Sequence, residues 1–141
     1  MMKLGQLLWL PLLVLLVVLG ACKSEPVTAP RTVEVLITLS EFKIESPMTR
    51  FAKGVPYRFT ITNKGQLPHE LMVVSPLSGH MAMEEMHQMA LLSIKEDHLP
   101  PGASSTAGIT FDKSYAEGEM ELACHLPGHY DTGMRLPIRV D

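Results

Sequence analysis

The chain has 141 residues, of which 46% are hydrophobic, and its formal charge is only −3. This length fits one compact domain, and the apolar content is too high for a disordered chain. Because the 12 Lys and Arg residues are fewer than the 15 Asp and Glu residues, we expect no basic surface for nucleic acid.

The N-terminal part differs in composition from the rest. Lys3 precedes an unbroken apolar run over residues 7–19, which is too short to span a bilayer as a stable helix and is typical of a signal peptide. The run ends in Leu-Gly-Ala-Cys at residues 19–22, which resembles the lipobox of bacterial lipoproteins. That resemblance implies acylation of Cys22 and a lipid anchor on the outer face of a membrane, outside the cytoplasm. The expected organisation is a signal peptide over residues 1–21, a flexible tether over 22–31 and a single domain over 32–141.

An alternative is an ordinary signal peptide followed by an incidental thiol at Cys22. If Cys22 is acylated, the second cysteine of the chain, Cys124, has no partner for a disulfide. A lone thiol in an oxidising compartment favours a role such as metal ligation.

Alternating hydrophobic residues predict a small all-β domain. An apolar residue at every second position is the period of a strand with one buried face. Turn signals such as Asn63-Lys64-Gly65 separate these runs. Several short strands of this kind favour a Greek-key antiparallel β-sandwich. The predicted strands cover residues 32–39, 55–61, 71–73, 109–111, 120–124 and 136–140, with a weaker continuation of the first at Phe42 and Ile44.

One segment lacks the strand pattern. Residues 80–92 are rich in helix formers and contain no Gly or Pro, which predicts one short inserted helix. On such a helix His80, Met83 and His87 share a face, and imidazoles and thioethers suit Cu(I). Two interpretations stay open: a helix packed on the sandwich with methionine as adaptable filler, or a second, weaker copper site or docking patch.

Four further residues carry the ligand types of a copper site. Cys124, His129 and Met134 lie on one predicted loop between two strands, and His69 begins a strand far upstream. Two imidazoles, a thiolate and a weak thioether are the ligands of a mononuclear type 1 (blue) copper site. Taken singly, Cys124 and Met134 fit ordinary core residues as well.

The Cys-x4-His-x4-Met spacing with an upstream His resembles the cupredoxins, the family of plastocyanin and azurin, over nearly all of residues 32–141. The resemblance implies one copper ion held by His69, His129 and Cys124 as equatorial ligands and by Met134 as the axial ligand.

Two positions depart from that family. Glu70 stands where many cupredoxins have Asn after the first histidine. His125 makes the loop similar to that of multicopper oxidases, but Ala123 precedes Cys124 and the chain has no His-x-His pair. The trinuclear cluster of those oxidases is therefore not expected, and we predict that His125 is a surface residue facing away from the copper.

The predicted function is one-electron transfer by an extracytoplasmic, lipid-anchored protein with no organic cofactor and no catalytic activity. We expect a monomer that docks transiently on a redox protein near His129, with Leu126, Pro127 and Leu136 as apolar contacts. The alternative is a copper-delivery or copper-resistance protein that surrenders Cu(I), which the Met/His-rich helix favours.

Overall fold

The structure is a computed structural model that describes residues 31–77 and 81–141. The predicted signal peptide, most of the tether, Cys22 and His80 lie outside these residues. Within the described part, none of the helices is long and apolar enough to cross a membrane. The strands are β1 (Val33–Ser40), β2 (Lys43–Glu45), β3 (Arg50–Phe51), β4 (Pro56–Asn63), β5 (Leu71–Val74), β6 (Leu92–Ile94), β7 (Ser104–Thr110), β8 (Tyr115–Ala123) and β9 (Arg135–Val140), and the helices are α1 (Met83–Met89) and a 3₁₀ turn (Glu96–His98).

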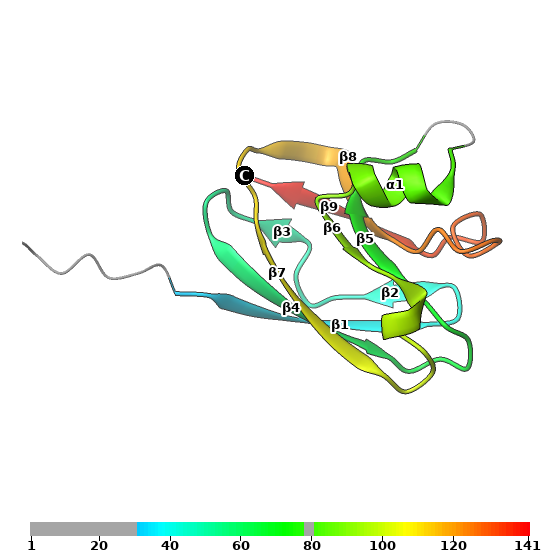
Figure 1. Ribbon diagram of the computed structural model, residues 1–141. Coiled ribbons are helices and arrows are strands. Elements are labelled where there is room, and N and C mark those ends of the chain that lie inside the picture. Colours follow the sequence, from blue (N-terminus) through cyan, green and yellow to red (C-terminus); the bar gives the residue numbers. More distant parts are fainter. Residues whose placement is uncertain (1–30, 78–80) are drawn as a thin grey trace, which may run out of the picture.

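The strands form two sheets that face each other (Figure 1). One sheet has the order β2-β1-β4-β7 and the other has the order β3-β9-β8-β5-β6. The predicted all-β sandwich with one short helix is confirmed. Both sheets are mixed rather than purely antiparallel, because β1 pairs with β4, and β3 with β9, in parallel. Parallel partners need a crossover connection, and here the chain between β1 and β4 passes through β2 in one sheet and β3 in the other.

Several segments differ from the sequence prediction, which does not include β3 and begins β7 and β8 five residues too late. Phe42 does not continue the first strand, because the chain turns there with a φ of 60° and returns antiparallel as β2. The predicted helix over residues 80–92 is shorter, since α1 covers Met83–Met89 and Leu92 begins strand β6. The β-branched and apolar residues of β5 offer Leu92 a pairing partner in Val73, and this tertiary pairing overrides helix propensity.

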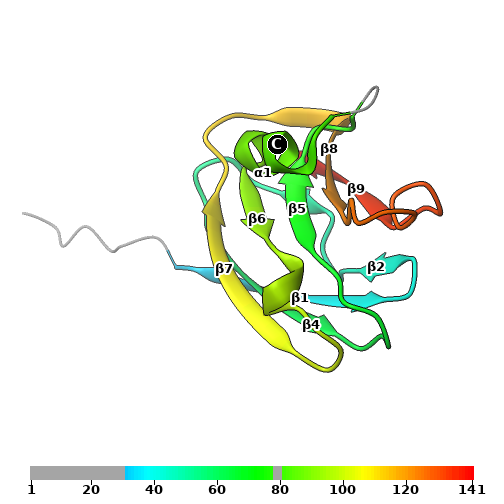
Figure 2. The ribbon, with the colours of Figure 1, turned by 45° about the vertical axis from the view of Figure 1, so that its right-hand side comes forward.

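The main core fills the space between the sheets. The predicted alternation is confirmed in β4, where Tyr57, Phe59 and Ile61 all point into it. A second, smaller cluster lies on the outer face of the five-stranded sheet under α1, and Figure 2 shows α1 beside β5 and β6. Because both faces of β5 are covered, all four of its residues are buried. The small cluster consists of Met72, Val74, Met86 and Ala123.

Candidate metal centre

Loops from distant parts of the chain meet at one end of the sandwich. The β1–β2 turn, the β4–β5 loop and the β8–β9 loop lie on the same side of the molecule in Figures 1 and 2. His69 lies in the β4–β5 loop two residues before β5, Cys124 follows β8 directly, His129 lies in the β8–β9 loop and Met134 directly precedes β9.

The structure brings His69, Cys124 and His129 together. One ligand atom from each lies within 4.8 Å of the others, and all three side chains are buried. The two histidine Nδ1 atoms are 3.3 Å apart, and the Cys124 Sγ lies 3.4 Å from Nδ1 of His129. Two imidazoles and a sulfur that converge without a carboxylate form a donor set suited to copper. These residues therefore fit a copper ion.

Met134 lies beside this cluster in the fold and is completely buried. Its carbonyl accepts the Cys124 N–H (3.1 Å), and its own N–H donates to the carbonyl of His129 (3.0 Å). The β8–β9 loop is thus closed by its own backbone, with Gly128 and Gly133 at positive φ angles of 81° and 99°, a conformation that favours glycine. These bonds hold all three C-terminal candidate ligands on a compact turn.

Burial shifts the pKa values of His69 and Cys124. It lowers the pKa of His69, and the neighbouring His129 lowers this pKa further, so His69 is neutral and able to ligate at neutral pH. Burial also raises the pKa of the Cys124 thiol to about 11. The thiol is therefore protonated in the metal-free protein, and a metal ion must displace that proton on binding.

Glu70, at the position where many cupredoxins have Asn, is a buried carboxyl group. Its Oε1 accepts the backbone N–H of His125 (2.8 Å), and its Oε2 lies 3.4 Å from Nε2 of His87 on α1. Burial raises the pKa of Glu70 to about 7 and lowers the pKa of His87. Both directions favour a neutral pair that shares the Glu70 proton. Glu70 thus supports the chain next to Cys124 and links it to α1.

The prediction that His125 is a surface residue is only partly correct, because the side chain is half-buried. Its ring stacks on Tyr130 with centroids 4.3 Å apart and an 18° interplanar angle, and its Nε2 atom is buried. His125 lies outside the His69, Cys124 and His129 cluster. It is half-buried because Tyr130 stacks on its ring, which strand alternation alone does not reveal.

Of the predicted secondary set of His80, Met83 and His87, His80 lies outside the described residues, so the set as a whole stays a prediction. His87 already has partners at both ring nitrogens, with Nδ1 2.6 Å from the Ser93 hydroxyl and Nε2 facing Glu70.

The sequence interpretation missed two aromatic neighbours of the site. Phe42 is 45% exposed and lies edge-on to the ring of His129, with centroids 5.6 Å apart. Tyr130 donates its hydroxyl hydrogen to Oε1 of Glu121 (2.6 Å) and accepts a hydrogen bond from Arg135 (3.2 Å). In the sequence, the position of Tyr130 next to His129 was the signal that could have placed it near the site.

Comparison with known proteins supports the fold. No family model matches the chain. The chain is 27% identical over 110 residues to the "Copper-resistant cuproprotein CopI" of Rubrivivax gelatinosus, and the match covers 75% of this chain but only 64% of that relative. Among solved structures, it resembles reduced auracyanin from Roseiflexus castenholzii with a TM-score of 0.55 and 19% identity, over 81% of this chain and 99% of auracyanin. It resembles rusticyanin from Thiobacillus ferrooxidans with a TM-score of 0.58 and 18% identity, over 80% and 79% of the two chains.

The chain therefore has the cupredoxin fold, as the ligand spacing predicted. The fold places a His-Cys-His cluster of copper-ligand type at the loop end of the sandwich.

Proposed function

We propose that the protein is a one-electron carrier with a type 1 copper ion held by His69, Cys124, His129 and Met134. The observation that carries this proposal is the buried convergence of the first three residues, whose donor atoms lie within 4.8 Å of one another. When bound, copper supplies one-electron redox chemistry with soft sulfur and imidazole ligands that serve both oxidation states. The surrounding strands and the closed β8–β9 loop restrain the ligands, so little rearrangement accompanies electron transfer.

The surface around His129 supports docking of a redox partner. His129 is 8% exposed, whereas His69 and Cys124 are completely buried, so His129 offers the edge of the site nearest to solvent. Phe42 and Leu67 are exposed apolar residues from the β1–β2 turn and the β4–β5 loop, and Pro127 is exposed on the β8–β9 loop. A small apolar surface of this kind suits a weak, transient complex. We place the protein outside the cytoplasm and attached through Cys22, on the sequence signals for export and lipidation.

The visible and EPR spectra of the copper-loaded protein test this function. We expect an intense thiolate-to-copper band and a reversible redox couple. Cys124→Ser should abolish the band, because the thiolate supplies the charge-transfer electron, and retention of the blue colour in this variant would contradict the assignment.

Met134 is tested separately. Replacing a weak thioether by a stronger oxygen donor stabilises Cu(II), so Met134→Gln should lower the reduction potential measured by voltammetry. Met120, which is also buried in the core, provides the control: Met120→Leu should leave the potential unchanged. Equal potentials in the wild type and Met134→Gln would remove Met134 from the ligand set.

Copper delivery is the second candidate function. The likeness to a protein named for copper resistance favours it, as do the methionines of α1. A carrier retains its metal through redox cycles, whereas a delivery protein passes Cu(I) to an acceptor. Rapid loss of Cu(I) to a competing chelator from the His69, Cys124 and His129 site would favour delivery over electron transfer.

A further inference from the structure

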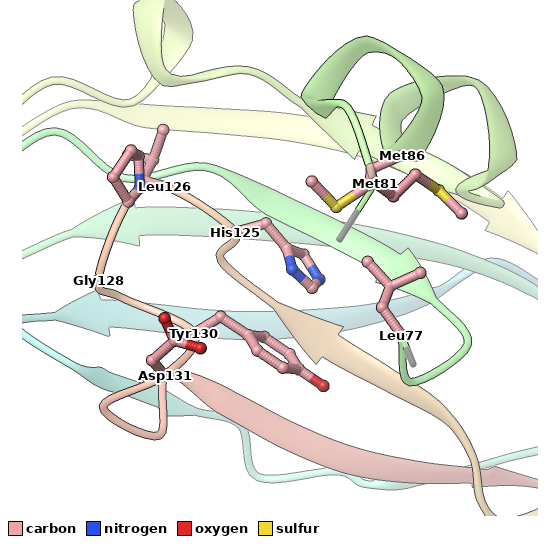
Figure 3. A pocket seen from close by; sticks show the side chains of 9 residues that line it. Leu77, Met81, Met86, His125, Leu126, Gly128, Tyr130 and Asp131 are labelled. Atoms are coloured by element: carbon pink, nitrogen blue, oxygen red, sulfur yellow. The ribbon is translucent and has the colours of Figure 1, made fainter. Parts of the chain in front are cut away.

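A cavity lies between α1 and the β8–β9 loop. It is on the outer face of the five-stranded sheet, whereas Cys124 faces the main core on the inner face. The cavity volume is about 410 Å³. Figure 3 shows Met81 and Met86 on one side of the cavity, with His125 facing it from the loop. Apolar groups of Leu77, Leu126 and Tyr130 complete much of its wall.

His125 presents an unused nitrogen in this region. Its Nε2 atom is buried and has no hydrogen-bond partner among the described residues. A buried polar atom without a partner is rare in folded proteins and calls for a specific explanation, such as a bound ion.

The ring of His125 is held in place by contacts that leave Nε2 free. One face stacks on Tyr130, whose hydroxyl group is bonded to Glu121 and Arg135. The backbone N–H of His125 is held by Glu70. A side chain restrained in this way is preorganised for a ligand, since little further ordering is needed on binding.

Two methionine side chains line the same cavity as His125. Met86 is buried on α1, and Met81 is half-buried two residues before that helix begins. Thioethers are soft, neutral ligands that select Cu(I) over harder divalent ions. The carboxylate of Asp131 also lines the cavity but is exposed, so the buried donors are all neutral.

We propose that Met81, Met86 and His125 form a second metal site, selective for Cu(I). It differs from the predicted set of His80, Met83 and His87 in all three residues. It does not depend on the proposed type 1 site, although Cys124 and His125 are neighbours in the chain and present their side chains to opposite faces of the sheet.

Anaerobic titration with Cu(I), in competition with bicinchoninate, tests the site. Met81→Leu and Met86→Leu should each retain one equivalent of Cu(I) fewer than the wild type, or bind that equivalent at least tenfold more weakly. The matched control is Met89→Leu, because Met89 lies on the same helix but is 59% exposed, and it should bind as the wild type does. The readout is a difference from the wild type, so it is independent of whether the type 1 site also holds copper. Identical binding in the wild type and both variants overturns the proposal.

A second measurement uses the unaltered chain and avoids any folding defect of the variants. In protein with ¹³C-methyl methionine, Ag(I) serves as a redox-inert substitute for Cu(I). We expect the methyl resonances of Met81 and Met86 to shift as Ag(I) is added, while the resonance of Met89 stays in place. Shifts confined to Met134 would mean that the cavity binds no soft ion, and would overturn the second site while leaving the first intact.

Discussion

Asn63 and Gly65 position the first candidate ligand, His69. The Asn63 amide donates to the carbonyls of Leu67 and Leu99 (2.8 and 2.9 Å), and its oxygen accepts the N–H of Gly65 (2.8 Å). The backbone N–H of His69 also donates to the carbonyl of Leu99 (3.2 Å). The completely buried Asn63 side chain therefore joins the β4–β5 loop to the segment that carries His69's backbone partner.

Gly65 leaves room for the His69 ring. A Cβ atom at this position would lie 3.0 Å from Nε2 of His69 and would also collide with Glu41. We expect Gly65→Ala to displace the imidazole by a few tenths of an ångström and to weaken Cu(II) binding about tenfold or more, since metal sites tolerate little misplacement of ligands. Competition titration with a chelator measures the effect. Gly108→Ala is the control, because its Cβ would make only an ordinary 3.8 Å contact, and an equal effect of both substitutions would contradict the steric argument.

At the scale of elements, Glu70 links three parts of the fold. It lies directly before β5, its Oε1 holds the first residues of the β8–β9 loop, and its Oε2 faces His87 on α1. His87 in turn contacts Ser93 of β6. Helix α1 is thus connected to the β8–β9 loop by the polar contacts of Glu70 and His87. It also packs on the sheet through the smaller apolar cluster.

We expect Glu70→Ala to lower the free energy of unfolding of the metal-free protein by about 1–3 kcal/mol, because the buried N–H of His125 loses its acceptor. Glu70→Gln retains an oxygen at this position and should lose less. Urea denaturation measures both variants. If Ala and Gln have equal effects, the hydrogen bond to His125 contributes nothing.

The raised pKa of Glu70 also predicts that the free energy of unfolding depends on pH. Its pKa is raised to about 7 in the folded protein from a usual value of 4.5, so the folded state holds the proton more tightly than the unfolded state. The stabilisation is complete below pH 4.5 and is lost as the pH rises through 7. Relative to Glu70→Gln, which does not titrate, the wild type should lose stability between these pH values. Urea denaturation at several pH values measures this loss, and parallel pH profiles of the two proteins would contradict the prediction.

Across the whole molecule, we expect metal binding at the candidate site to be coupled to folding. His69 and the β8–β9 loop meet only in the folded protein, so a metal ion that binds there stabilises the folded state by mass action. The gain is about 4 kcal/mol when the free metal concentration is 1,000 times the dissociation constant.

Copper should therefore raise the melting temperature of the wild type by several degrees, and Cys124→Ser should lose most of this increase. Since the pKa of the Cys124 thiol is raised to about 11, binding at pH 7–8 releases one thiol proton, and the apparent affinity should increase about tenfold per pH unit. Calorimetry in buffers of different ionisation enthalpy counts the released proton. Binding without proton release would exclude thiolate ligation.

Much of the fold was predictable because its signals are local. The alternation in β4 and β8 identifies the core-facing residues Tyr57, Phe59, Met120 and Leu122, all confirmed in the main core. Ligand identity and the spacing of the C-terminal loop are also properties of adjacent residues, so the convergence of Cys124 with His129 could be expected from sequence.

Other features depended on contacts between distant segments. Strand alternation identifies a buried face but not its neighbour, so it did not reveal the parallel pairing of β1 with β4 or the role of Leu92 in β6. It also gave no indication that Glu70 contacts His87, or that the ring of His125 stacks on Tyr130.

The sequence alone was enough to predict the class of fold, the chemical types of the candidate metal ligands and the positions of most strands, because period and composition act over a few residues. The parallel strand pairs, the contacts of Glu70 with His125 and His87, and the cavity lined by Met81, Met86 and His125 were visible only in the folded chain. These features arise from packing between elements far apart in the chain, and local propensity carries no information about that packing.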